Sequence, residues 1–272
     1  MQQEKALYEQ FMNILGVNRR SPSQAALSEL IKAHLSTIPF ENISKLYYKK
    51  HNNLYQLPSL ELYLNGIETY HFGGTCFSNN YYFFKLLGFL GYSVKLCAAD
   101  MKKPGCHMVI MLTLEQKEYL VDVGYAAPFI QPIPLQLSED YTVTNGRDLY
   151  IFKPRDQSGC TKLLMFRNGS YKHGYTVCPI ARHIEDFKQV IKESFNPDST
   201  FSRSLLITRL ISGRFCTLHN MEYMEARGEL SKIHPIGDRE ELISCIAERF
   251  HVPVSIGEKV IPGLDLSGDP WH

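Results

Sequence analysis

Apolar side chains recur at helical spacing along the start of the chain. The segment EKALYEQFMNILGV (4–17) carries such a pattern up to Gly16, and glycine is a common helix terminator. The next such segment is SQAALSELIKAHL (23–35), and either Ser21 or Ser23 is placed to cap it. These two patterns predict two amphipathic helices.

A third helix is predicted to begin near Cys76. Its aromatic residues Phe77, Tyr81 and Phe84 fall at positions i, i+4 and i+7, which places them on one helical face. Together with the two earlier segments, this pattern predicts that the first ninety residues form a helical lobe.

From Ser93 onward the helical spacing gives way to short apolar runs separated by Gly, Pro, Asn and Asp, as is typical of antiparallel strands. We expect strands within residues 94–101, 107–114, 118–125, 148–154, 162–169 and 171–177. The chain then predicts a helix over 182–194, strand-like runs at 204–211 and 216–225, and an amphipathic helix over 238–250. The middle of the chain therefore reads as a β-lobe.

Length and charge limit the classes of function. The chain has 272 residues, 44% of them hydrophobic, which is enough for two or three modest lobes. Its 29 basic and 28 acidic residues give a formal net charge of +1. We therefore expect no long-range field that would recruit nucleic acid or an anionic membrane, and a neutral ligand or partner fits equally well.

The cysteines predict neither a disulfide framework nor a metal site. They form an odd set of seven, scattered and without a C-x-x-C pair. Cys106 lies beside His107, but no second ligand pair has suitable spacing, so we expect no metal. The polar start MQQEKALYEQ and the lack of a long apolar stretch favour a cytoplasmic protein with no membrane segment. Asn168-Gly169-Ser170 is best interpreted as a turn.

Cys76 is either a nucleophile or a core thiol. Free cysteines are commonly buried as small hydrophobes, and the preceding Gly73 and Gly74 are typical of any tight turn. However, a thiol at the start of a helix faces unpaired amide groups and the positive end of the helix dipole, which stabilise a thiolate. A nucleophile at Cys76 therefore requires partners elsewhere in the chain.

His107 and Asp122 are the candidate partners. His107 begins one predicted strand and Asp122 lies in the next. A two-residue turn at Gln116-Lys117 would offset the pair by roughly 13 Å, whereas a turn at Glu115-Gln116 reduces the offset to roughly 6.6 Å. We expect the second register, in which the side chains can meet. The alternative is that Asp122 caps the following glycine turn and His107 satisfies a backbone carbonyl.

Three motifs, IPFENIS (38–44), GGTCFSNN (73–80) and YLVDVGYAAP (119–128), resemble those of the arylamine N-acetyltransferases. The resemblance implies an α+β fold with a helical bundle (1–92), an antiparallel β-barrel (93–200) and an α/β lid (201–272). It also implies a cysteine-protease-like Cys-His-Asp core that maps onto Cys76, His107 and Asp122. Such enzymes are cytoplasmic, use acetyl-CoA as acyl donor and acetylate aromatic amines or hydrazines through an acetyl-cysteine, so a ping-pong mechanism is expected.

The chain departs from the family pattern beside the cysteine. Phe72 stands where the family has an arginine, and Ser78 stands where it has a glutamate. The arginine would normally pair with the carboxylate that corresponds to Glu41, and a buried unpaired carboxylate is costly. We therefore expect His71, Lys45 or solvent to replace it, with the pKa of His71 raised by Glu41 if His71 is the partner.

Aromatic residues and phosphate-binding side chains complete the expected site. By position, Phe40, Tyr125 and Phe201 are candidates for stacking on a flat amine, although each is equally compatible with plain core packing. The candidates for binding coenzyme A are Lys103, Gly105, Ser199 and Thr200, because phosphates seek amides, hydroxyls and ammonium groups.

Two other classes of function use the same residues. A papain- or transglutaminase-like hydrolase would employ the same Cys-His-Asp set with water as the acceptor. A non-catalytic relative would bind coenzyme A or a partner without turnover. The sequence leaves the physiological acceptor and the oligomeric state open.

Overall fold

The computed structural model describes residues 2–266, and the outermost ends of the first and third predicted lobes, Met1 and 267–272, lie outside them. The amino-terminal part is helical, and its helices are α1 (Gln2–Leu15), α2 (Gln24–Thr37), α3 (Ile43–Asn52), α4 (Leu60–Tyr70) and α5 (Cys76–Phe89). Ser23 caps α2 because its hydroxyl accepts a hydrogen bond from the Ala26 N–H at 3.2 Å. The three predicted helices are confirmed, whereas α3 and α4 were not predicted.

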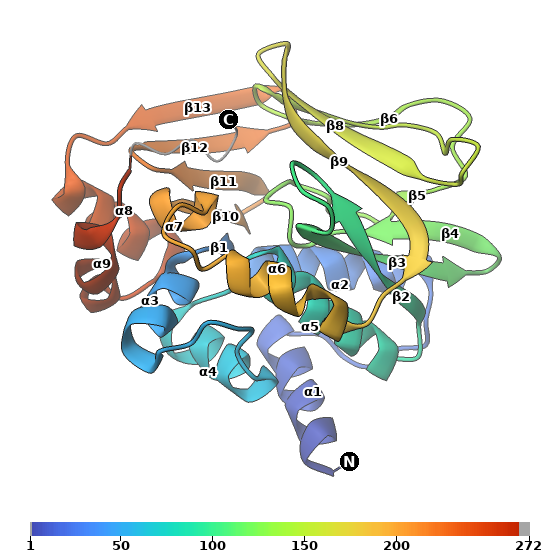
Figure 1. Cartoon of the computed structure of the whole chain (residues 1–272), viewed down its shortest axis with the longest axis horizontal. Helices are drawn as coiled ribbons and strands as arrows, with labels where there is room; N and C mark the ends of the chain where they lie inside the picture. Colours follow the sequence, from blue (N-terminus) through green and yellow to red (C-terminus); the bar gives the residue numbers. More distant parts are fainter. Residues whose placement is uncertain (1, 267–272) are drawn as a thin grey trace.

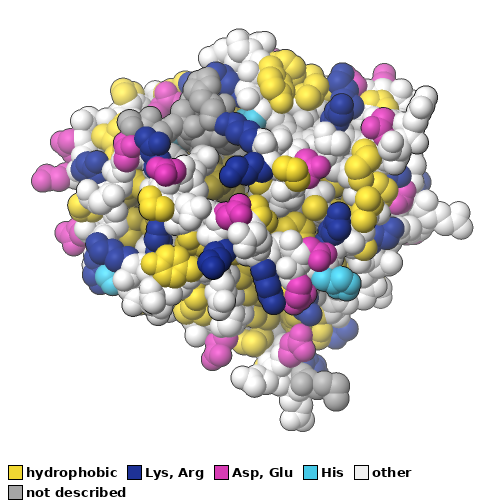
Figure 2. Space-filling model, viewed as in Figure 1, with side chains coloured by type: hydrophobic (Ala, Val, Ile, Leu, Met, Phe, Trp, Pro, Cys, Tyr) yellow, Lys and Arg dark blue, Asp and Glu magenta, His cyan; other side chains and the backbone are white. Residues whose placement is uncertain are grey.

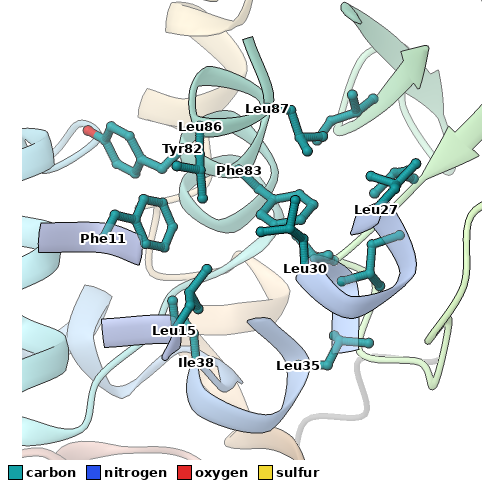
Figure 3. Packing of buried hydrophobic residues seen from close by; sticks show 14 of the residues in the cluster. Phe11, Leu15, Leu27, Leu30, Leu35, Ile38, Tyr82, Phe83, Leu86 and Leu87 are labelled. Carbon is teal, nitrogen blue, oxygen red and sulfur yellow. The ribbon is translucent and has the colours of Figure 1, made fainter. Parts of the chain in front are cut away.

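The core of the helical part forms where α1, α2 and α5 meet. Figure 3 shows Phe11, Tyr82 and Phe83 among leucines contributed by all three helices. The Phe83 side chain is fully buried, and the equally buried His34 ring packs edge-on against it with 5.0 Å between ring centroids. The helical spacing read from the sequence therefore identifies the buried faces of these helices.

The middle of the chain folds into an eight-stranded antiparallel sheet that curls into a nearly closed barrel (Figure 1). Its spatial order is β5-β4-β3-β2-β9-β8-β7-β6. Asn168 and Gly169 both have positive φ angles and form the predicted turn between β8 and β9. The strands are β2 (Ser93–Asp100), β3 (His107–Leu114), β4 (Lys117–Val121), β5 (Ile133–Pro134), β6 (Tyr141–Asn145), β7 (Asp148–Phe152), β8 (Thr161–Arg167) and β9 (Ser170–Ala181).

The hairpin of β3 and β4 has the predicted register. Leu114 pairs with Lys117, so the turn consists of Glu115 and Gln116, both with positive φ angles. A two-residue turn of this kind matches the twist of antiparallel strands. The register confirms the shorter of the two offsets considered for His107 and Asp122.

A second antiparallel sheet of five strands combines one strand from the amino-terminal part of the chain with four from its carboxyl-terminal part. Its order is β1-β10-β11-β12-β13, and β1 pairs Phe40 with Thr208 of β10. The predicted strand over 216–225 is in fact a hairpin, because the chain turns at Asn220, which has a φ of 47°. The strands are β1 (Phe40–Glu41), β10 (Leu206–Ile211), β11 (Arg214–His219), β12 (Glu222–Arg227) and β13 (Leu230–Pro235).

Short helices connect and flank the two sheets. In Figure 1, α6 and α7 lie on the near side of the molecule, and α8 and α9 lie beside the second sheet. The sequence predicted the helix over 182–194 and the one over 238–250 but neither α7 nor α9. These elements are η1 (Ile184–Phe187), α6 (Lys188–Glu193), α7 (Thr200–Arg203), α8 (Arg239–Phe250), α9 (Val254–Val260) and η2 (Ile261–Gly263).

One disulfide corrects the reading of the cysteines. Cys160 and Cys178 are bonded across β8 and β9, with 4.1 Å between their Cα atoms. The two residues are 18 apart in sequence and meet only because the strands pair. The prediction was that the cysteines form no disulfide framework, and it missed this bonded pair.

The helices and antiparallel sheets confirm the predicted α+β class. On the face shown in Figure 2, acidic and basic side chains are interspersed. Among residues 2–266, no helix is long and apolar enough to cross a membrane.

Candidate active site

Cys76 is the first residue of α5, and the two glycines before it are required by close packing. A Cβ atom on Gly73 would lie 1.9 Å from the Pro39 carbonyl oxygen, and one on Gly74 would lie 2.2 Å from the Ser78 hydroxyl. Neither glycine has a positive φ angle. The glycines therefore let the chain segment before α5 lie directly against β1, where Gly74 forms an isolated bridge with Phe40, rather than making a sharp turn.

Gly124 brings the loop after β4 against the start of α5. A Cβ atom at Gly124 would lie 2.7 Å from the Cys76 Cα atom, which real contacts do not allow. This glycine therefore permits the approach of the chain segment that carries Asp122 to the helix that carries Cys76.

The three residues of the predicted Cys-His-Asp set lie together and are buried. His107 Nε2 and Asp122 Oδ2 are 2.8 Å apart, and the Cys76 side chain is hydrogen-bonded to the imidazole. Because Asp122 occupies His107 Nε2, the hydrogen bond with the Cys76 sulfur is made by the other ring nitrogen, Nδ1. The arrangement is that of a thiol, an imidazole and an orienting carboxylate.

Asp122 is held by further donors from three parts of the chain. Its Oδ1 accepts hydrogen bonds from Asn80 Nδ2 at 2.8 Å and from the Gly124 N–H at 3.1 Å. Its Oδ2 also accepts one from the Tyr175 hydroxyl at 3.1 Å. The glycine cap that was the alternative role for Asp122 is therefore present, together with the bond to His107.

The charges of the set favour an imidazolium. Burial lowers the pKa of His107, but the Asp122 carboxylate and the bonds to Asp122 and Cys76 outweigh it and raise the pKa to about 10. At neutral pH the ring is therefore protonated.

Cys76 lines a cleft of about 590 Å³, a volume within the range of small-molecule sites. All three predicted aromatic residues, Phe40, Tyr125 and Phe201, line it. The Phe40 and Phe201 rings meet edge to face at 5.6 Å, and the Tyr125 ring lies 5.6 Å from the His107 ring. The structure thus brings these rings to the wall that carries Cys76.

The residues predicted to bind coenzyme A divide into two groups. Lys103, Ser199 and Thr200 line the same cleft. Gly105 lies outside the set of lining residues, and its N–H donates to Asp100 Oδ1 at 2.7 Å, which shapes the loop between β2 and β3. The structure therefore supports a place at the cleft for three of the four candidates.

Sequence reasoning missed two residues that hold Asp122. Asn80 lies four residues after Cys76, so the helical repeat places it on the same face of α5, and this spacing was a usable signal. It also donates to the Met108 carbonyl at 2.7 Å and accepts from the Val123 N–H at 2.9 Å. Tyr175 reaches the site from β9, far along the chain, and no local pattern marked it.

The expectations for Glu41 were wrong. The carboxylate is fully buried and accepts hydrogen bonds from the backbone N–H groups of Ser44 at 2.8 Å and Gly73 at 3.0 Å. Burial raises the pKa of Glu41, and these bonds oppose the shift. Within residues 2–266, no cation forms an ion pair with it. Backbone amides thus replace the missing arginine, as they do at helix N-termini.

Neither proposed cation reaches Glu41. His71 is exposed and caps α4 in a left-handed conformation, and burial and the nearby His251 and Arg209 lower its pKa rather than raise it. Lys45 instead bonds to Ser194, which directly follows α6. Phe72 lies in an apolar cluster with Tyr47 and Tyr48, so a hydrophobic contact occupies the position of the family's arginine.

Comparisons with known proteins agree with this fold. A sequence model of the N-acetyltransferase family matches residues 24–260. YvcN of Bacillus subtilis strain 168, described as an uncharacterized acetyltransferase, is 29% identical over 244 residues, which cover 84% of this chain and 92% of YvcN. Arylamine N-acetyltransferase, pineal gland isozyme NAT-3, of Gallus gallus is 26% identical over 292 residues, which cover 91% of this chain and 93% of that protein.

A solved structure extends the match to three dimensions. Mycobacterium marinum arylamine N-acetyltransferase in complex with CoA aligns with a TM-score of 0.77 at 19% identity, covering 93% of this chain and 98% of that one. The fold is thus that of an acetyltransferase. The chain belongs to the arylamine N-acetyltransferase family, which confirms the resemblance read from its three motifs.

Proposed function

We propose that this protein transfers an acetyl group from acetyl-CoA to an aromatic amine or hydrazine through an acetyl-cysteine at Cys76. The observation that carries the proposal is the Cys76 thiol, which lines a ligand-sized cleft and is backed by the His107 and Asp122 pair. Membership of the family supports it, as does the relative that was solved in complex with CoA.

In the first half-reaction, the Cys76 thiolate attacks the carbonyl carbon of the thioester. The oxygen of the resulting tetrahedral intermediate is negative, and the Cys76 N–H at the start of α5 is a suitable donor to it. The bond between that carbon and the CoA sulfur then breaks. The CoA sulfur keeps the electron pair and takes the proton from the His107 imidazolium, which leaves neutral histidine and acetyl-Cys76.

In the second half-reaction, the amine enters the vacated cleft and attacks the acetyl carbon. Neutral His107 takes a proton from the amine nitrogen, and the Cys76 sulfur leaves as a thiolate. The imidazolium and thiolate of the resting enzyme are thereby restored. Because both reactants use one cleft in turn, the expected kinetics are ping-pong.

The lining residues suggest how the substrates bind. The rings of Phe40, Tyr125 and Phe201 suit a flat amine, since aromatic pairs favour offset or edge geometry. Lys103, with Ser199 and Thr200, would bind phosphate groups of the donor at the opening. We also propose that the chain is divided into a helical part (1–92), a barrel (93–200) and a lid (201–272).

Intact-mass spectrometry after brief mixing with acetyl-CoA tests the proposal. The wild-type protein should gain one acetyl group on Cys76 and lose it when an arylamine is added. A Cys76→Ala variant should gain none. Cys106 lines the same cleft, so Cys106→Ala is the matched control and should behave as the wild type. A wild-type protein that cleaves amide substrates but gains no acetyl group would identify a hydrolase instead.

A further inference from the structure

Lys45 places an ammonium group in the wall of the cleft that Cys76 also lines. It belongs to the first turn of α3 and lines the cleft together with Thr75 and Cys76. The ammonium donates to the Ser194 main-chain oxygen and, at 2.9 Å, to the Ser194 hydroxyl. It also lies 4.5 Å from the centroid of the Phe195 ring. The side chain is therefore fixed at its tip rather than free in solvent.

The nucleophile of the proposed reaction is an electrostatic partner of this ammonium. Lys45 interacts electrostatically with Cys76, and no carboxylate in the described part of the chain forms an ion pair with it. Burial lowers the pKa of Lys45 to about 7, the Cys76 charge opposes the shift, and Lys49 on the same helix adds to it. The other charged or titratable groups that line the cleft include His107 of β3 and the carboxylates Glu193 and Asp198. Three further lysines also line it, and they are Lys102, Lys103 and Lys172.

Acylation of Cys76 changes this balance of charge. A thiolate carries one negative charge, and the thioester formed from it carries none. Among residues 2–266, the ammonium of Lys45 then keeps the neutral groups of Ser194 and Phe195 as partners. Because a partly buried cation is stabilised by a paired anion, an acyl group that carries its own negative charge would restore the lost interaction.

We propose that Lys45 is a specificity-determining residue that binds the free carboxylate of a dicarboxylic acyl group, of the malonyl or succinyl class, attached to Cys76. This inference rests on the proposed role of Cys76 as the acyl acceptor. The cleft has room for the longer acyl chain, since its volume is about 590 Å³.

The chemistry of transfer is unchanged in this case. The thiolate attacks the thioester carbonyl, the bond to the CoA sulfur breaks, and the free carboxylate takes no part in bond making. Four lysines and two carboxylates line the cleft, so an anionic acyl donor meets a favourable field on entry.

Two alkylating reagents of nearly equal size test the charge at this wall without any acyl transfer. Iodoacetate leaves a carboxymethyl group on the thiol, whereas iodoacetamide leaves a neutral amide. The measured quantity is the rate of Cys76 alkylation by iodoacetate divided by its rate with iodoacetamide. This ratio should be lower on the order of tenfold in Lys45→Met, which lacks the cation, than in the wild type. Peptide mass spectrometry assigns the modified thiol.

Lys49 provides the matched control. It lies one helical turn further along α3, donates to the Phe195 carbonyl at 2.8 Å, and is absent from the residues that line the cleft. Lys49→Met should not lower the rate ratio, because loss of Lys49 favours the charged form of Lys45. The wild-type ratio should also fall as pH rises through about 7, where Lys45 loses its proton, and the Lys45→Met ratio should show no such step. Equal ratios in the wild type and Lys45→Met would overturn the inference.

Acyl donors complete the test. Single-turnover acylation by malonyl-CoA, relative to acetyl-CoA, should fall on the order of tenfold in Lys45→Met and should not fall in Lys49→Met. If acetyl-Cys76 forms but the malonyl preference does not depend on Lys45, the inference fails while the proposed function stands. If no donor acylates Cys76 although iodoacetamide does, the proposed function fails.

Discussion

At the scale of single residues, the Asp122 carboxylate connects the parts of the site. It accepts hydrogen bonds from His107 on β3, Asn80 on α5, Tyr175 on β9 and the backbone of Gly124. Each donor comes from a different segment, and each fixes one lone-pair direction of the two oxygens. An amide in place of the carboxylate has one oxygen for donors on both sides, so it cannot satisfy them all.

Asp122→Asn should therefore abolish most turnover while the protein stays folded. The amide nitrogen facing His107 would hold the wrong tautomer, and we expect kcat/KM for acetyl transfer to fall by roughly 10⁴-fold. Asp148→Asn is the control, because Asp148 is also buried but bonds to Arg167 at 2.7 and 2.8 Å, within the barrel. Near-normal turnover of folded Asp122→Asn would leave Asp122 with only its capping role.

A buried histidine should make the helical part sensitive to acid. His34 is fully buried, and neither of its ring nitrogens has a hydrogen-bond partner in the described part of the chain. Burial lowers the pKa of His34 to about 3. The unfolded chain therefore binds a proton near pH 6.5 that the folded protein does not, so stability is lost as pH falls below that value.

Substitution of this residue measures the effect. Between pH 7 and pH 5, protonation of the unfolded chain at His34 should lower the free energy of unfolding by about 2 kcal/mol. His34→Leu should remove that part of the pH dependence, as followed by urea denaturation at both values. An unchanged difference between the two pH values in His34→Leu would show that other groups cause it.

At the scale of elements, β9 links the site to the disulfide. The strand carries Tyr175, which bonds Asp122, and His173, whose Nδ1 lies 2.7 Å from the Tyr125 hydroxyl. Three residues beyond Tyr175, Cys178 is bonded to Cys160, the residue directly before β8. The bridge therefore constrains the strand that supports two residues of the cleft.

The disulfide should contribute measurably to stability. Its sequence separation of 18 residues is close to that of loops worth about 3 kcal/mol in the chain-entropy account. We expect the free energy of unfolding of Cys160→Ser/Cys178→Ser to be lower than that of the oxidised wild type by that amount. The variant should therefore have a lower urea midpoint. Reductant should lower the wild type to the same value and leave the variant unaffected. A wild-type midpoint that does not respond to reductant would contradict the bridge.

At the scale of the whole molecule, the two ends of the chain share one core. Phe72, which follows α4, belongs to a buried cluster together with Leu218 of β11 and Phe250 of α8. Strand β1 also pairs with β10, which places the motif around Glu41 in the same sheet as the carboxyl-terminal strands. The amino-terminal helices and the second sheet should therefore unfold together.

Phe72→Ala tests this coupling. The side chain is 1% exposed, and truncation of such a buried ring costs about 3–5 kcal/mol. The control is Tyr55→Ala, at a ring that is 46% exposed, which should cost well under about 1 kcal/mol. Circular dichroism and hydrogen exchange should report one common transition at a lower midpoint in Phe72→Ala. Separate transitions for the two ends would show that the shared core does not couple them.

The sequence by itself determined the longer amphipathic elements and the chemistry of the motifs, although α3, α4, α7 and α9 were not predicted. The helical spacing of apolar residues located α1, α2, α5 and α8, because the residues of a buried helical face recur every three or four positions. The β3–β4 register was also local, since the turn at Glu115 and Gln116 sets every pair along the hairpin. Those signals, with the family motifs, were enough to name Cys76, His107 and Asp122 before any contact was known.

Only the tertiary structure decided the partners that come from distant segments. Tyr175 reaches Asp122 from 53 residues away, and Lys45 meets Ser194 across 149 residues, so no local pattern records either contact. The sequence also indicated that the Glu41 carboxylate needs partners, but it did not identify them. They are backbone N–H groups, which every residue except proline possesses, so no residue type marks them. Sequence patterns record side-chain type at short range, whereas packing brings together groups whose identity and separation carry no periodic signal.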